Sequence, residues 1–208
     1  MNENGTKDRR IILRIGTLKL LVLMSFLLVF MVQIEPATAW AEPNHYEIVY
    51  QVYYNLPDDV HENLSLFEMM EGAGDPDLRF LDFQNHHYPQ SQVKADYWLN
   101  QGRNYYLNQD YGNASYCFGV ASHYISDGLC PPHTGGGHTG YLHTKFELEA
   151  LCFTPHINMS ENQSMDELYN NSTANWMNWV KTGDRSSIQD SLNNAASESY
   201  IQIKNACT

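Results

Sequence analysis

Hydrophobic residues along most of this chain recur every three or four positions, the spacing that places them on one face of a helix. In the segment 44–57 the apolar positions include Ile48, Val49 and Val52, and the pattern ends at Pro57. The same periodicity predicts further helices at residues 59–71, 91–108, 113–129, 140–152, 165–182 and 185–205. Alternation of apolar and polar residues never extends beyond a few positions. We therefore predict an all-α fold, a compact bundle of several helices.

The stretches between these helices are rich in residues that favour turns. Gly and Pro are frequent at 71–77, which predicts a loop there. Residues 78–90 have no clear period and indicate irregular structure, and the polar segment 154–164 indicates a second long loop.

The first 39 residues have the three parts of a secretory signal peptide. A basic segment at 7–19 is followed by an apolar run, Leu20–Val32, and by an Ala-x-Ala cleavage site. Cleavage after Ala39 would leave Trp40 as the first residue of a secreted protein, with residues 40–208 as one domain. The apolar run is short for a membrane span, which needs ~20 residues. The alternative is an uncleaved segment that anchors the protein to the membrane.

Residues 40–208 are strongly acidic, which bears on the partners that the protein can meet. The whole chain has a formal charge of −12. The first 39 residues hold five of the 12 Lys and Arg and three of the 24 Asp and Glu, so the remainder carries −14. At long range such a surface repels nucleic acid and anionic membranes. Bound metal ions reverse the sign inside a site, so an anionic substrate group remains compatible with this charge.

The four cysteines leave two alternatives open. Cys117 and Cys130 bracket one predicted helical stretch and lie ~20 Å apart at 1.5 Å per residue, too far for a disulfide. An exported chain can instead pair them with Cys152 or Cys207, for example as Cys130–Cys152. Free, buried thiols are the other alternative.

Potential metal ligands are concentrated in the stretch Cys117–Glu147. His123 and Asp127 are four residues apart, so a helix places them on one face. His143 and Glu147 repeat this spacing on a second predicted helix. Two such pairs indicate a common site, although solvated surface pairs are the alternative.

A Pro-Pro corner joins the two pairs and adds another ligand. Pro131 and Pro132 end the first helix, because proline cannot continue it, and His133 follows directly. Imidazole nitrogens and carboxylate oxygens are ligands that suit zinc. The sequence therefore predicts a zinc centre built from two helix faces and the corner between them.

These motifs resemble those of the bacterial zinc-dependent phospholipase C and alpha-toxin family. The segments HYISDGLCPPH at 123–133 and HTKFE at 143–147 are similar to the family's two main ligand motifs. Upstream, Gln84-Asn85-His86 is similar to its histidine loop and Pro76-Asp77 to its Pro-Asp loop, with His87 and Asp75 as neighbouring alternatives. The family shares its fold and a trinuclear zinc cluster with the fungal single-strand-specific nucleases.

The resemblance implies three zinc ions held by eight residues. These are Trp40, His45, His86, His123, Asp127, His133, His143 and Glu147. In the family, the first zinc binds the amino nitrogen and carbonyl oxygen of an N-terminal tryptophan, here Trp40, together with the residues that match His45 and Asp127. The second would be held by His86, His123 and a bridging Asp127, and the third by His133, His143 and Glu147. The resemblance gives Asp77 the role of a base or orienter for the attacking water.

The activity implied by the resemblance is hydrolysis of a phosphodiester by zinc-activated water. We expect a secreted, monomeric phospholipase C that meets a membrane surface transiently and releases diacylglycerol and a phosphorylated headgroup. A single-strand nuclease with the same cluster is one alternative, although the acidic charge and the lack of a basic stretch after residue 154 disfavour nucleic acid. A zinc-binding surface protein without catalytic activity is the other.

Overall fold

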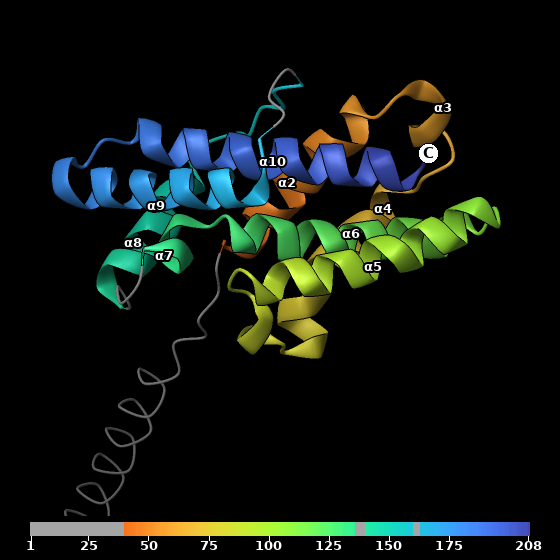
Figure 1. The fold of residues 1–208 in the computed structure, drawn as a ribbon, viewed down its shortest axis with the longest axis horizontal. Helices are drawn as coiled ribbons and strands as arrows, with labels where there is room; N and C mark the ends of the chain where they lie inside the picture. Colours follow the sequence, from red (N-terminus) through yellow and green to blue (C-terminus); the bar gives the residue numbers. More distant parts are fainter. Residues whose placement is uncertain (1–39, 136–139, 160–162) are drawn as a thin grey trace, which may run out of the picture. The chain divides into compact units, whose positions relative to one another are not determined.

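The computed structural model describes residues 40–135, 140–159 and 163–208, and within these ranges the fold is a bundle of helices without β-strands, as predicted (Figure 1). The α-helices are α2 (Glu42–Asn55), α3 (Asp58–His61), α4 (Leu66–Asp75), α5 (Gln90–Leu107), α6 (Tyr111–Gly128), α7 (Pro131–Thr134), α8 (Tyr141–Ala150), α9 (Met165–Thr182) and α10 (Ser186–Ala206). The predicted signal peptide lies outside the described residues. None of the described helices is both long and apolar enough to cross a membrane.

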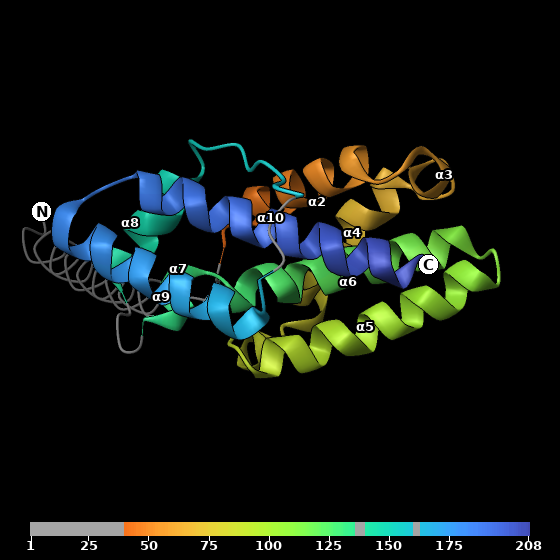
Figure 2. The same ribbon diagram turned by 45° about the horizontal axis from the view of Figure 1, so that its top comes forward.

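Helix α6 forms the centre of the bundle and is buried over most of its length. Helices α4 and α5 pack along it, and α2 and α10 also contact it. Figures 1 and 2 show α5 and α6 running alongside one another. Since α6 carries His123 and Asp127, its central position places both side chains inside the core.

Residues 71–77 are helical, so the prediction of a loop there is wrong. Helix α4 continues through its glycines into a short π-helix, η1 (Pro76–Phe80). A Cβ atom at Gly72 would lie 2.1 Å from the carbonyl oxygen of Tyr116 on α6, and one at Gly119 would meet a carbonyl oxygen of α4 at 2.0 Å. The glycines therefore allow close packing of α4 on α6 rather than a turn.

Two other boundaries differ from the predicted ones. The helix predicted at 59–71 is divided into α3 and α4, because Ser65 caps the start of α4 by accepting a hydrogen bond from the Glu68 amide at 3.3 Å. The segment predicted as irregular, 78–90, includes the end of η1 and a 3₁₀ turn, η2 (Phe83–Asn85).

An aromatic cluster fixes helix α8 against α9. The Trp176 and Trp179 rings of α9 stack with their centroids 5.4 Å apart. Phe146 of α8 packs edge-on against both of them, at 5.6 and 5.1 Å. These contacts anchor the helix that carries His143 and Glu147.

The four cysteines are free thiols in the structure, so the Cys130–Cys152 pairing is not found. Cys117, Cys130 and Cys207 are buried, whereas Cys152 is exposed. The core is therefore held by packing of apolar side chains without covalent links between these helices.

Candidate metal centre

The carboxylate of Asp127 is the point at which three imidazoles converge. It lies in the last turn of α6 and is fully buried. Its Oδ1 atom is 3.2 Å from Nε2 of His45, and its Oδ2 atom is 2.8 Å from Nδ1 of His86 and 3.0 Å from Nε2 of His123. Three elements distant in sequence thus bring nitrogen donors to one buried carboxylate.

Hydrogen bonds on the far sides of two rings fix which nitrogen faces Asp127. Nδ1 of His123 lies 2.7 Å from the carbonyl oxygen of Ala73, which can only accept, so this nitrogen carries the proton. Nδ1 of His45 lies 3.0 Å from the Ser126 hydroxyl, whose own proton is donated to the His123 carbonyl at 2.9 Å. In both rings the Nε2 lone pair is therefore left to point toward Asp127.

Asp77 lies among these donor atoms. Its Oδ1 atom is 3.6 Å from Nδ1 of His86 and 3.9 Å from Nε2 of His123. The neighbouring Asp75 points elsewhere, because it accepts hydrogen bonds from Tyr116 at 2.6 Å and Arg79 at 2.8 Å. The structure thus favours Asp77 over Asp75 as the site residue and places it in one group with the donor atoms of His86 and His123.

Trp40 reaches the same carboxylate from the start of the described chain. Its backbone nitrogen is 3.5 Å from Oδ1 of Asp127, and its indole donates a hydrogen bond to the Ser126 carbonyl at 2.9 Å. The side chain is completely buried and packs on Phe146. Trp40 and His45, which are five positions apart in the sequence, therefore both lie at the centre.

The residues predicted to hold the third zinc ion lie at the Pro-Pro corner and on the helix that follows it. Nε2 of His143 is 2.7 Å from Oε1 of Glu147 on α8. The His133 ring of α7 lies edge-on to that of His143, with centroids 5.3 Å apart. His87 is exposed and packs on His133 at 4.2 Å, away from Asp127, so the buried His86 is the better ligand.

Unpaired polar atoms show that these residues fit a metal ion. Apart from the short contacts that the site residues make with one another, several buried nitrogen and oxygen atoms have no hydrogen-bond partner among the described residues. They are His45 Nε2, both ring nitrogens of His86 and His133, His123 Nε2, Asp77 Oδ1, Asp127 Oδ2 and Glu147 Oε1. Such atoms are costly to bury unless something else binds them. Nitrogen and carboxylate oxygen donors without competing hydrogen bonds are suited to zinc.

Two compact donor groups are found in the described part of the chain. One is His45, His123 and Asp127, and the other is Asp77, His86 and His123. In each group the ligand atoms lie within 4.8 Å of one another. His133, His143 and Glu147 are brought together more loosely and are not one of these groups. The geometry thus supports a close pair of metal positions most directly.

The surroundings of Asp127 and His133 favour the forms of these two residues that bind metals. Burial opposes ionisation of Asp127, but the imidazoles of His123, His45 and His86 outweigh it and hold its pKa well below the usual range. Burial lowers the pKa of His133 to about 3, so this ring is neutral at pH 7. A carboxylate and a neutral imidazole are the states that donate lone pairs to zinc.

Burial also raises the pKa of Asp77. The imidazole of His123 opposes this rise, and the charge of Asp127 adds to it. Asp77 therefore accepts a proton more readily than an ordinary aspartate, as a base requires.

Sequence reasoning missed two supports of the centre. Ser126 and the carbonyl of Ala73 orient His45 and His123, yet neither is a metal ligand. Only the position of Ser126, directly before Asp127, could have indicated its role from the sequence. A backbone carbonyl has no sequence signal, so the role of Ala73 is visible only in the structure.

Comparison with known proteins agrees with this geometry. A family model described as zinc dependent phospholipase C matches residues 44–192. This span includes every predicted site residue except Trp40. No curated protein and no solved structure matches the chain. Because the family model covers well over half of the sequence, the chain belongs to the zinc-dependent phospholipase C family.

Proposed function

We propose that the protein is a secreted phospholipase C, which hydrolyses the bond between glycerol and the phosphate of a phospholipid. The products would be diacylglycerol and a phosphorylated headgroup. The observation that supports this most strongly is the convergence of His45, His86 and His123 on Asp127, beside Asp77, in a member of this family.

The chain's own residues have separate tasks in this proposal. Zinc, when bound, would lower the pKa of water toward about 7 and so provide the nucleophile at neutral pH. Asp127 and its imidazoles would hold zinc at the buried base of the site. Asp77, slightly exposed and with Oδ1 free of hydrogen bonds among the described residues, would orient the attacking water and accept its proton.

The third set would hold a further zinc ion close to the phosphate. His133, His143 and Glu147 each keep some exposure to solvent, whereas Asp127 is fully buried. The partly exposed residues would let the substrate phosphate enter from solvent. The buried residues around Asp127 would hold the attacking water inside the site. Three ions per chain are therefore part of the proposal.

Substitution of Asp77 by Asn tests whether the protein is an enzyme. We expect release of phosphocholine from phosphatidylcholine to fall by about 100-fold or more, since general-base catalysis contributes 10²–10⁴-fold. Zinc per chain should be measured on the same samples, because Asp77 also lies among the donor atoms. Asp190→Asn, a charge-matched change at an exposed position, should leave the rate unchanged.

Two outcomes would contradict the proposal. A wild-type protein that binds zinc but hydrolyses no phosphodiester would be a metal-binding protein. Cleavage of single-stranded DNA in preference to phospholipid would make it a nuclease.

A further inference from the structure

Large apolar side chains are exposed next to the metal centre, on η1 and the adjoining face of α5. They are Leu78 (58% exposed), Phe80 (39%), Leu81 (61%), Val93 (68%) and Tyr97 (55%), which we call the rim surface. Single exposed apolar residues are common on proteins, but a group of them at one place indicates contact with an apolar partner.

Ring contacts and an ion pair join the two parts of the rim surface. Phe80 stacks on Trp98 of α5, with ring centroids 5.8 Å apart, and Tyr97 lies edge-on to the same ring at 5.4 Å. Lys94 pairs with Asp82 at 2.9 Å. In Figure 1 the segment around residue 80, drawn in dark yellow, lies beneath the N-terminal half of α5.

The backbone at Leu81 is strained. Its φ of 52° and ψ of 41° lie in the left-handed region, which residues other than glycine rarely adopt. The Asp82 amide closes this turn by donating to the Pro76 carbonyl at 3.1 Å. The Leu81 side chain is mostly exposed, so it contributes little to the stability of the fold. A role in contact with a partner explains why an apolar side chain is held there.

The rim surface is continuous with the metal centre. Asp77 belongs to η1 and faces the imidazoles, while Leu78 and Phe80 of the same short helix face solvent. A partner that covers the rim surface would therefore stand beside the carboxylate that we assign to catalysis.

The charges of this surface favour a neutral partner. Arg79 pairs with Asp75 at 2.8 Å and lies 3.6 Å from Glu71, and Lys94 pairs with Asp82. Both cations are thus matched by carboxylates, and neither is left to attract anionic lipid. Zwitterionic headgroups, which carry no net charge, are compatible with an apolar surface of this kind.

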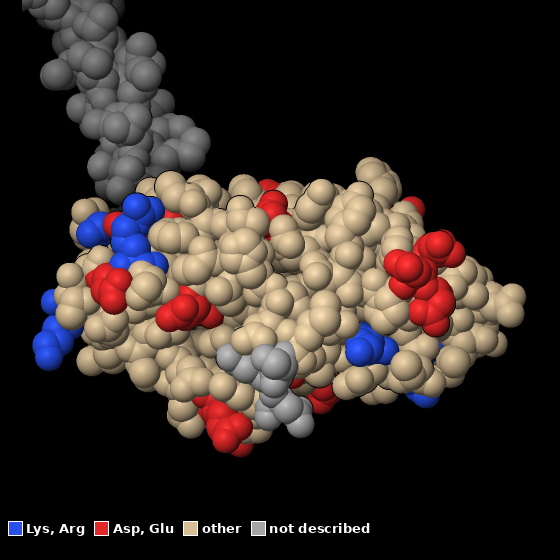
Figure 3. Space-filling view, turned by 90° about the horizontal axis from the view of Figure 1, so that it is seen from above, with Lys and Arg blue, Asp and Glu red and all other residues tan. Residues whose placement is uncertain are grey.

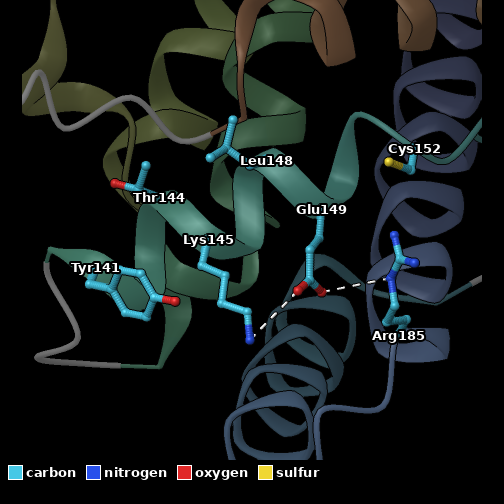
Figure 4. A pocket seen from close by; sticks show the side chains of 7 residues that line it. All are labelled: Tyr141, Thr144, Lys145, Leu148, Glu149, Cys152 and Arg185. Carbon is cyan, nitrogen blue, oxygen red and sulfur yellow. Dashed lines mark ion pairs between the residues drawn. The ribbon is translucent and has the colours of Figure 1, made fainter.

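A different surface would suit anionic lipid. On the face drawn in Figure 3, basic side chains gather at one end of the molecule, with acidic side chains among them. Along α8, a hollow of about 410 Å³ is lined by Lys145 and, from the turn between α9 and α10, by Arg185. Glu149 lies between them at 3.7 Å from each (Figure 4). This basic end is carried by the face of α8 opposite His143 and Glu147.

We propose that the rim surface docks the protein on zwitterionic phospholipid bilayers, with Leu81 and Val93 entering the lipid. This inference rests on the proposed function, because it names the surface by which a phospholipase C would reach its substrate. Docking at this face would place the Asp77 side of the centre against the membrane.

The test compares the double variant Leu81→Gln and Val93→Gln with a matched control. Both positions are exposed, so neither change should affect folding. The control, Leu107→Gln with Met177→Gln, alters side chains that are 58% and 53% exposed at other places. Flotation would use the zinc-loaded protein with vesicles of a phosphonate analogue of phosphatidylcholine, in which carbon replaces the leaving oxygen. This lipid cannot be hydrolysed there, so binding is measured apart from catalysis.

We expect the double variant to lose vesicle binding by about tenfold or more, because each apolar side chain contributes through the area that it buries in lipid. The control should bind as the wild type does. We expect 0.5 M NaCl to change the binding little, and added phosphatidylserine not to strengthen it. A second assay uses short-chain phosphatidylcholine as dissolved monomers, on which the double variant should keep the wild-type rate.

Three results would overturn the inference. Equal binding by the double variant and the wild type would exclude the rim surface. A requirement for phosphatidylserine would move the contact to the basic end with Lys145 and Arg185. A wild-type dimer in sedimentation that the double variant abolishes would show that a second copy covers the surface. If the wild type floats with the phosphonate vesicles but hydrolyses neither phosphatidylcholine vesicles nor the short-chain monomers, the proposed function fails while the docking surface remains.

Discussion

At the scale of single residues, the centre depends on side chains that set the direction of the ligands. Ser126 donates its proton to a backbone carbonyl and so presents only an acceptor to Nδ1 of His45. The carbonyl of Ala73 has the same effect on His123. Such hydrogen bonds fix the tautomer and the orientation of each imidazole ring. They strengthen metal binding although Ser126 and Ala73 do not contact the ion.

Substitution of Ser126 by Ala should therefore weaken zinc binding and leave the fold intact. The imidazole of His45 would lose its fixed tautomer, and we expect a loss of about 10- to 100-fold in zinc affinity. Competition with a chromogenic chelator measures this directly. The control is Ser172→Ala on α9, where the buried hydroxyl has no hydrogen-bond partner among the described residues. Equal affinity in both variants would show that Ser126 does not orient His45.

Much of the site could be predicted at this scale, and the reasons differ between residues. His123, Asp127, His143 and Glu147 show helical spacing, so one sequence pattern locates them. His45, His86 and Asp77 lie on separate elements, and only the family resemblance pointed to them. Ser126 and Ala73 act through geometry that no sequence pattern records.

At the scale of elements, the close packing of α4 on α6 holds the centre together. Helix α4 supplies the Ala73 carbonyl and leads into η1 with Asp77, while α6 carries His123 and Asp127. The predicted loop at 71–77 was wrong because glycine has two uses. It favours turns, and it also lets two helix backbones approach closely; the sequence of one element alone does not distinguish these uses.

A methyl group at Gly72 should disturb this contact. For Gly72→Ala we expect a loss of about 1–3 kcal/mol in the free energy of unfolding, since the added Cβ would meet a backbone oxygen at 2.1 Å. Gly112→Ala at the start of α6 meets nothing within 4 Å and should be neutral or stabilising by up to about 1 kcal/mol. Urea unfolding of both variants measures the difference. Equal stabilities would contradict the packing role.

At the scale of the whole molecule, cleavage of the predicted signal peptide would change a group at the metal centre. The backbone nitrogen of Trp40 already lies 3.5 Å from Oδ1 of Asp127. Cleavage after Ala39 would turn this amide into an amine with a lone pair, which can bind zinc. Removal of the leader would then complete the site as well as release the protein.

Protein that begins at Trp40 should therefore bind more zinc than protein that keeps Ala39 in front of it. An amide nitrogen has no lone pair to donate, so we expect the extended form to lose one ion per chain or to hold it more weakly. Elemental analysis after dialysis gives the zinc content, and intact mass of the secreted protein gives its first residue. An alanine added after Thr208 is the control for added length. A secreted protein that begins elsewhere would refute this role of cleavage.

The central claim is that this centre hydrolyses a phospholipid with zinc. The most direct measurement mixes zinc-loaded protein beginning at Trp40 with phosphatidylcholine vesicles and follows diacylglycerol and phosphocholine together. The account predicts that both products appear in equal amounts, that a chelator stops their release, and that added zinc restores it. No release, or release that a chelator does not affect, would contradict it.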